Sequence, residues 1–322
     1  MPSQVAMGLV RIEELITKLD RAAIKHLSRL PALRSLDLEI PDLQHLGSSA
    51  SVSQPHPFPA LRNLSFFSST IDFAVEFLDV LSDCSLSSFR IGTEVLATKF
   101  IIGQLYSALP NHLSHTALES LLVRLTEEGY MPTPQADMIT NYVINGRILA
   151  PLFYFRNLTS ISLSPPVGFD IYDATAWEIA RAWPKLCSLE LSSATGLHHP
   201  SRITLDGLRA FAKHCEALTC IAITVDASVV PQIDDNVETR LTQSSLLHFD
   251  VGRSPILDPS TIAQFTSGLF PCLETIDTHN EWLWDDPLIE DEDGEMAEAH
   301  ALHQRWKEVE ALLPNTVSNS VS

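Results

Sequence analysis

A short pattern of apolar positions recurs along the chain at intervals of 25 to 40 residues. The clearest copies begin at Leu30, Phe58, Phe155, Trp183 and Phe270, with apolar side chains at the first, fourth and seventh positions and in most copies at the ninth. Every copy, clear or weak, has a leucine at the fourth position, and these nine anchors are Leu33, Leu61, Leu86, Leu118, Leu158, Leu186, Leu218, Leu246 and Leu273. Nine similar strings in order indicate a repeated structural unit.

The end of each copy alternates between apolar and polar residues. In the first copy Leu36 and Leu38 flank Asp37. Successive side chains of an extended strand point to opposite faces, so the leucines are expected in the core and the aspartate in solvent. The same argument places a set of residues in the core, namely Leu36, Leu163, Leu189 and Ile223. It places a second set in solvent, namely Asp37, Ser162, Glu190 and Thr224.

Between the predicted strands, apolar residues recur at helical spacing. The predicted helices cover residues 71–81, 97–109, 136–152, 174–182, 204–214 and 260–269. One strand and one helix cannot enclose a core, so neighbouring units must stack. The predicted fold is an α/β leucine-rich-repeat solenoid, a right-handed and horseshoe-like superhelix. Its parallel sheet would lie on the concave side and its helices on the convex side.

The predicted organisation is a single solenoid domain over residues 1–322, with about nine irregular repeats over residues 31–280. An apolar stripe predicts an N-terminal capping helix over residues 1–30, formed by Leu9, Ile12, Ile16, Leu19, Ala23 and Leu27. A second stripe predicts a C-terminal capping helix over residues 297–314, formed by Ala299, Leu302, Trp306, Val309 and Leu313. Such helices would cover the core at the ends of the array, although the last could also pack on the convex side. The acidic residues 285–296 are expected to form a flexible loop.

The charge balance narrows the classes of partner. Forty acidic residues against twenty-one basic ones give a formal net charge of −19. This charge repels phosphate backbones and anionic lipid, so we expect neither nucleic acid nor membrane as a partner. It favours a partner protein with a basic surface. The chain shows no secretory signal at its start and no long apolar run, so a cytoplasmic or nuclear location is expected, without secretion.

The motifs of phosphate-binding loops, nucleophile elbows and zinc proteases do not occur in the sequence. Cys215 and Cys220 lie beside His214, but zinc sites need a second close pair, so we expect buried, reduced thiols. The acidic run at 291–294 lacks the acids that a calcium loop needs at its first and twelfth positions. We therefore expect no catalytic residue, metal, cofactor or small-molecule substrate, and the predicted function is not enzymatic.

The strand face opposite the core is the candidate partner-binding surface. Small polar residues with scattered charges suit a shallow contact with a macromolecule better than a closed pocket. The candidate contact residues are Asp37, Glu39, Arg90, Arg124, Glu190, His248, Asp250, Asp277, His279, Trp282 and Trp284. The two tryptophans could equally cover the end of the core.

The string Leu-Pro-x-Leu-x-x-Leu-x-Leu, in irregular units of this length, resembles the leucine-rich-repeat regions of fungal F-box proteins. That resemblance implies substrate-recognition repeats of an F-box-like ubiquitin-ligase adaptor. The residues ahead of Leu30 lack the longer helical segment of an F-box, so this chain is not expected to bind the adaptor subunit of the ligase. A free-standing repeat scaffold is the alternative. A GTPase-activator-like regulator would need a catalytic arginine within a polar cluster, whereas Arg90 and Arg124 are isolated.

Overall fold

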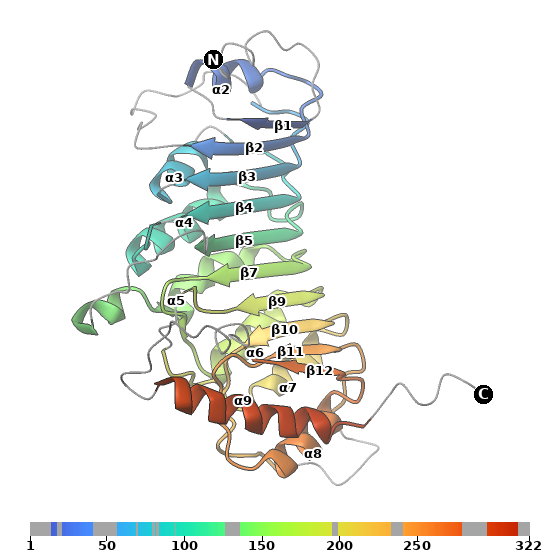
Figure 1. The fold of residues 1–322 in the computed structure, drawn as a ribbon. Coiled ribbons are helices and arrows are strands. Elements are labelled where there is room, and N and C mark those ends of the chain that lie inside the picture. Colours follow the sequence, from blue (N-terminus) through green and yellow to red (C-terminus); the bar gives the residue numbers. More distant parts are fainter. Residues whose placement is uncertain are drawn as a thin grey trace. The chain divides into compact units, whose positions relative to one another are not determined.

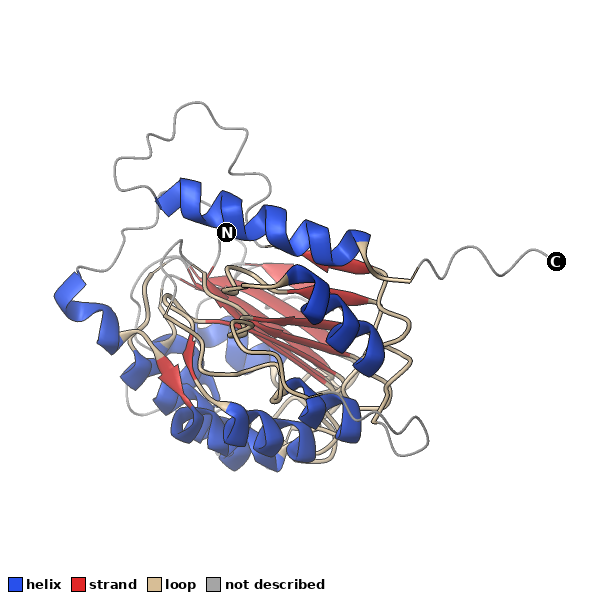
Figure 2. Ribbon diagram, turned by 90° about the horizontal axis from the view of Figure 1, so that it is seen from below, coloured by secondary structure: helices blue, strands red, loops and turns tan. Residues whose placement is uncertain are grey.

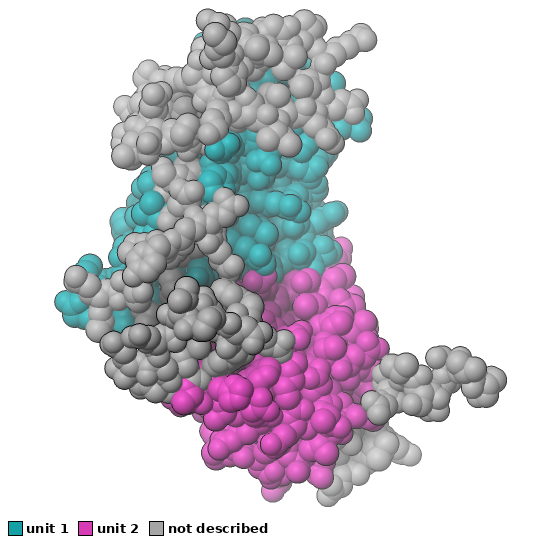
Figure 3. Space-filling model, viewed as in Figure 1, with its two compact units in different colours: residues 1–168, 193–197 teal, residues 169–192, 198–322 magenta. Residues whose placement is uncertain are grey.

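The computed structural model describes residues 14–17, 21–40, 57–68, 70–78, 81, 84–93, 95–125, 136–194, 199–232, 241–278 and 295–314. The chain divides into two compact units (Figure 3). Unit 1 comprises residues 1–168 and 193–197, and unit 2 comprises residues 169–192 and 198–322. The single domain expected over residues 1–322 stays a prediction.

Unit 1 contains a parallel sheet whose strands follow one another in chain order (Figure 1). Its strands are β1 (Glu14–Thr17), β2 (Ser35–Ile40), β3 (Asn63–Ser68), β4 (Ser88–Thr93), β5 (Ser120–Leu125) and β7 (Ser160–Ser164). Ser35, Asn63, Ser88, Ser120 and Ser160 are partners across neighbouring strands, so the strands align without stagger. The five strands predicted in this part of the chain are confirmed.

Unit 2 contains four further parallel strands, which confirm the remaining predictions of strand and direction. They are β9 (Ser188–Leu191), β10 (Cys220–Ile223), β11 (His248–Asp250) and β12 (Thr275–Asp277). Both units therefore combine parallel strands with helices, as expected for an α/β fold.

The nine anchor leucines are at most 1% exposed, so each unit is built around them. The backbone turns in a similar way before several strands. The N–H groups of Leu61, Leu186 and Leu273 each donate to the carbonyl three residues earlier, on Phe58, Trp183 and Phe270 respectively. The core strand positions Leu36, Leu163, Leu189 and Ile223 are buried as predicted.

Helices occupy most of the segments between the strands. They include α2 (Arg21–Leu27), α3 (Asp72–Leu78), α4 (Lys99–His112), α6 (Asp173–Ala182), α7 (Leu208–His214) and α8 (Pro259–Leu269). Local signals set their starts. The Thr98 hydroxyl accepts from the N–H of Ile101 at the start of α4, and Asp258 caps α8 ahead of Pro259. The predicted helix over 204–214 begins later, at Leu208.

The N-terminal segment differs from the predicted capping helix. Residues Glu14–Thr17 form β1, which pairs in parallel with β2, and a helix follows at Arg21–Leu27. Ile16 is thus a strand residue. Pairing with β2 gives the backbone N–H and carbonyl groups of this segment hydrogen-bond partners on a neighbouring strand. In a helix the same groups would bond within the segment itself. The other residues of the predicted helix, 1–13 and 18–20, lie outside the described part of the chain.

The helix predicted over 136–152 is instead a series of short elements. These are a 3-10 turn η1 (Ala136–Asn141), β6 (Ile144–Asn145), α5 (Gly146–Leu149) and a second 3-10 turn η2 (Ala150–Tyr154). Asn145 is extended, and its side chain accepts from the N–H groups of Arg147 and Ile148. Asn145 is thus both the last residue of β6 and the N-cap of α5. Pro151 then favours the first turn of η2.

The final helix, α9 (Glu295–Ala311), lies alongside the last strand of unit 2 (Figures 1 and 2). Of its predicted stripe, Trp306 and Val309 are fully buried. The indole N–H of Trp306 donates to the carbonyl of Ser254 at 2.9 Å. Side chains of α9 also bond the middle residue of β12: Glu310 accepts from the N–H of Ile276, and Lys307 donates to its carbonyl.

Candidate open-face binding site

The strand face opposite the core, here called the open face, carries two aligned rows of side chains in unit 2. One row contains Glu190, Ala222, Asp250 and Asp277, which are register partners on β9 to β12. The other row contains Ser188, Cys220, His248 and Thr275. These side chains alternate with the buried residues of the same strands, as the period of two requires.

The three carboxylates of the first row form what we call the acidic row: Glu190, Asp250 and Asp277. Neighbouring strands lie about 4.8 Å apart, so the row spans about 14 Å across unit 2. Glu190 accepts a hydrogen bond from the Ser192 hydroxyl at 3.2 Å, and Asp250 accepts from the N–H of Gly252 at 2.8 Å. These bonds orient two of the carboxylates. The structure therefore brings three of the predicted contact residues together.

Cys220 lies among these carboxylates, a position that the sequence analysis missed. Its side chain is half-buried on the open face, whereas Cys215 is fully buried. The expectation of two buried thiols is therefore wrong for Cys220. Burial raises its pKa first, and the negative charges of Asp250, Glu190 and Asp277 raise the pKa further. Burial alone raises the pKa of Cys215 to about 12.

His248 stands exposed in the second row of the same face. Its Nδ1 lies 2.6 Å from the Thr275 hydroxyl on the neighbouring strand. This cross-strand hydrogen bond fixes the imidazole ring beside the acidic row. His248, one of the predicted contact residues, is thus held in place by a neighbouring strand.

The open face of unit 1 carries charges of both signs. Asp37 and Arg90 belong to one register row, two strands apart, and Glu39 and Arg124 belong to the next row. Leu122 lies in the row of Arg90 and is half-buried, an apolar position that the sequence analysis did not include. This face lacks the single sign of charge that the acidic row gives to unit 2.

The expectation that Ser162 faces solvent is wrong. Ser162 is 8% exposed, and its hydroxyl accepts from the Nε of Arg124 at 2.7 Å. The arginine on β5 reaches across to β7 and covers the serine. Asp37, Glu190 and Thr224, the other residues expected in solvent, are half-buried. The remaining candidates, His279, Trp282 and Trp284, lie outside the described residues.

The described part of the chain holds little that suits a small ligand. A cavity of about 10 Å³ in unit 1 is lined by Thr93, Tyr106, Arg124 and Ser164, among others. It has room for about one water molecule. No group of three or more histidine, cysteine, aspartate or glutamate side chains among the described residues could hold a metal ion. Among the described helices, none combines the length and the apolar character needed to cross a membrane.

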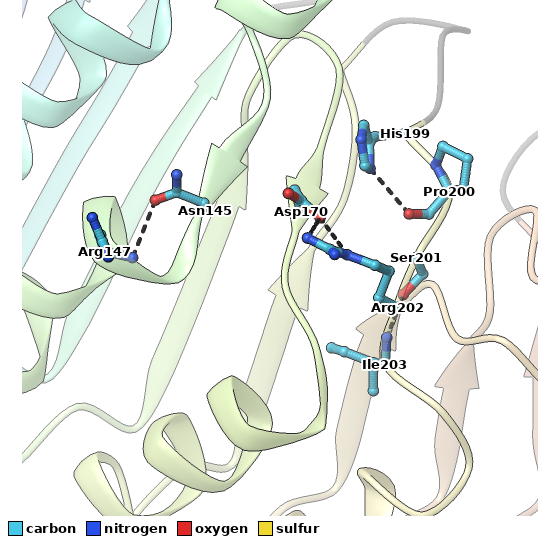
Figure 4. A network of polar contacts seen from close by, with 8 residues as sticks. All are labelled: Asn145, Arg147, Asp170, His199, Pro200, Ser201, Arg202 and Ile203. Atoms are coloured by element: carbon cyan, nitrogen blue, oxygen red, sulfur yellow. Dashed lines mark hydrogen bonds and ion pairs between the residues drawn. The ribbon is translucent and has the colours of Figure 1, made fainter.

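A polar network around Arg202 in unit 2 serves to hold segments of the chain together. The Nε of Arg202 donates to Asp170 at 2.8 Å, as Figure 4 shows, and its guanidinium lies 5.6 Å from the ring centre of Tyr172. Tyr172 and Arg202 also form an isolated parallel β-bridge. His199 is half-buried and bonds the carbonyl of Pro200. These contacts join two connecting segments and leave the acidic row as the stronger candidate site.

Comparison of the chain with protein-family models and with curated proteins finds no match.

Proposed function

We propose that this chain is a non-enzymatic protein-binding module, a leucine-rich-repeat solenoid that binds a basic segment of a partner protein on the open face of unit 2. The acidic row is the observation that carries the proposal. Glu190, Asp250 and Asp277 stand in one register row, and the small Ala222 separates the first two. A Lys or Arg side chain that approaches between these two carboxylates meets only the methyl side chain of Ala222 in the row.

The row is suited to a contact of modest strength. Exposed ion pairs contribute about 0.2–1 kcal/mol each, so three pairs supply about 0.6–3 kcal/mol. Such charges mainly accelerate association and select the partner, and they are screened by salt. The remaining affinity would come from the surface beside the row, where Cys220, His248 and Thr275 lie.

Within this class we favour the substrate-recognition repeats of an F-box-like ubiquitin-ligase adaptor, and the support for this finer assignment is the resemblance in the repeat string. A free-standing scaffold would share the same open face. The two differ in the fate of the bound partner, because a ligase subunit leads to its ubiquitination. Testing whether the captured partner is ubiquitinated in a manner that depends on this protein separates them.

The direct test measures binding of a basic probe. An eight-residue peptide of alternating Arg and Ser, labelled with fluorescein, is titrated with the protein and followed by fluorescence anisotropy. We expect the double variant Glu190→Lys/Asp250→Lys to weaken binding by about tenfold or more, since two attractive contacts become repulsive.

The control variant makes the same change in net charge elsewhere. Asp72→Lys/Glu76→Lys alters α3, whose Phe77 packs against the buried Phe66 of β3, so this helix lies on the core side of the sheet, opposite the open face. We expect it to change the affinity by less than about threefold, because charges beyond a Debye length of about 8–10 Å are largely screened. Equal weakening in both double variants would show attraction to net charge alone and would refute the proposed site.

A further inference from the structure

A buried tyrosine of unit 1, Tyr106, carries a hydroxyl without a hydrogen bond. Tyr106 lies on the buried face of α4, together with Ile102, Leu105 and Leu109. It is 1% exposed, and its hydroxyl bonds none of the residues that the structure describes. Buried tyrosine hydroxyls usually have a partner, because an unpaired one loses its hydrogen bonds to water on folding. An unpaired hydroxyl at this depth indicates a partner from outside the polypeptide.

The cavity of about 10 Å³ in unit 1 lies against Tyr106. Thr93 at the end of β4, Arg124 on β5 and Ser164 at the end of β7 also line it. These three strands are neighbours in the sheet, and α4 follows β4 in the chain (Figure 1). The cavity therefore combines room for about one water molecule with several polar side chains, and a buried water bonds about two to four such groups.

The polar side chains around the cavity supply both donors and acceptors. Burial raises the pKa of Tyr106 well above its usual value, so its hydroxyl keeps the proton and can donate it to a hydrogen bond. A hydroxyl has one donor and two acceptor positions, so those of Thr93 and Ser164 can bond a water beside their other partners. A water molecule can thus accept from Tyr106 and donate to the strand side of the cavity.

We propose that this cavity is a binding site for a single water molecule, which bonds the Tyr106 hydroxyl and links α4 to the ends of β4 and β7. Volume selects the ligand, because about 10 Å³ leaves no room for a larger polar molecule. A water held in this way is a part of the structure and stabilises the contact between helix and strands. The site lies within unit 1 and does not depend on the acidic row of unit 2.

A dry cavity predicts the opposite effect when the hydroxyl is removed. Tyr106→Phe keeps the ring and deletes the hydroxyl. If the hydroxyl is buried without a partner, its removal relieves a cost, and the protein should be equally stable or more stable. If the hydroxyl bonds a water, its removal breaks that bond and leaves the water with fewer partners, so stability should fall. The sign of the change separates the two cases.

Thermal unfolding of the full chain measures this sign. We expect Tyr106→Phe to lower the melting temperature by about 2–4 °C, the shift that the loss of about one hydrogen bond produces in a protein of a few hundred residues. The matched control Tyr154→Phe deletes the same group from a tyrosine that is 62% exposed, and it should shift the melting temperature by less than about 1 °C. An unchanged or raised melting temperature in Tyr106→Phe would overturn the proposal.

A crystal structure of the wild-type protein provides a second readout, which does not depend on any variant being folded. We expect electron density for a water about 2.5–3.0 Å from the hydroxyl oxygen of Tyr106, and within the same distance of the hydroxyl of Thr93 or Ser164. A cavity without this density would refute the water site, even if Tyr106→Phe lowers the melting temperature.

Discussion

In the turn before β11, the N–H of Leu246 donates to the side chain of Gln243. The corresponding N–H groups of Leu61, Leu186 and Leu273 donate to a backbone carbonyl instead. Removal of the Gln243 side chain should therefore lower the stability of the protein. Gln243 is 5% exposed. Its Oε1 accepts from the N–H groups of Leu246 at 2.9 Å and Ser245 at 3.1 Å. Its Nε2 donates to the carbonyls of Leu218 at 2.8 Å and Cys215 at 3.2 Å, in the preceding repeat. One amide group thus joins two successive repeats.

The substitution Gln243→Leu keeps the approximate volume but removes every one of these hydrogen bonds. It leaves the N–H of Leu246 and the carbonyl of Leu218 without this partner, next to fully buried side chains. An unsatisfied buried group costs about 1–3 kcal/mol, so the two groups together predict a loss of about 2–6 kcal/mol in the free energy of unfolding. Gln243→Glu should cost at least as much, because its carboxylate would face the two carbonyls.

Urea unfolding followed by circular dichroism measures the loss, and amide hydrogen exchange at Leu246 locates it. The matched control is Gln264→Leu, which alters an exposed glutamine of α8 and should change stability by less than about 0.5 kcal/mol. The reasoning fails if Gln243→Leu unfolds at the same urea concentration as the control. It also fails if the Leu246 amide exchanges at the wild-type rate in that variant.

Four further outcomes can be measured. Trp306→Ala should lower the free energy of unfolding by about 3–5 kcal/mol in urea titrations, because it empties a fully buried site and removes a hydrogen bond. Ser162→Ala should cost about 0.5–1.5 kcal/mol, and an unchanged melting temperature would count against its hydrogen bond. Near neutral pH, Cys220 should react with iodoacetamide more slowly than Cys187, because its raised pKa lowers the thiolate fraction. Asp250→Asn should lower that pKa and speed alkylation of Cys220, whereas an unchanged rate would show that Asp250 has no influence.

The repeat strands could be predicted because their signal is local and occurs nine times. Each anchor leucine is followed by a strand in the expected place, and the aligned copies also fix the register. The segment Glu14–Thr17 was harder, because four residues around Ile16 fit a helical stripe and a strand equally well. The neighbouring backbone of β2 decides between them, and no local pattern encodes that neighbour.

The acidic row follows from the period of two combined with the register, so Glu190, Asp250 and Asp277 could be found in the sequence. Cys220 occupies the same face by the same rule, but its chemistry was interpreted through the nearby Cys215. The contacts of Trp177 with Lys213 and the bonds of Gln243 could not be predicted. They depend on contacts between successive repeats some 30 residues apart, where the spacing varies from one unit to the next.

The contacts of α9 with Ile276 determine where this array can be lengthened. A newly added parallel strand would need the outward N–H and carbonyl of β12, and Glu310 and Lys307 already occupy these groups on Ile276. The ion pair between these two side chains, at 3.1 Å, holds them in place. A protein engineer who wants an additional repeat should therefore insert it before β12 and keep α9 last. A repeat appended after Ala311 would find no strand to pair with. The same occupancy protects β12 from recruiting strands of other molecules, which is the usual route from an open sheet to aggregation.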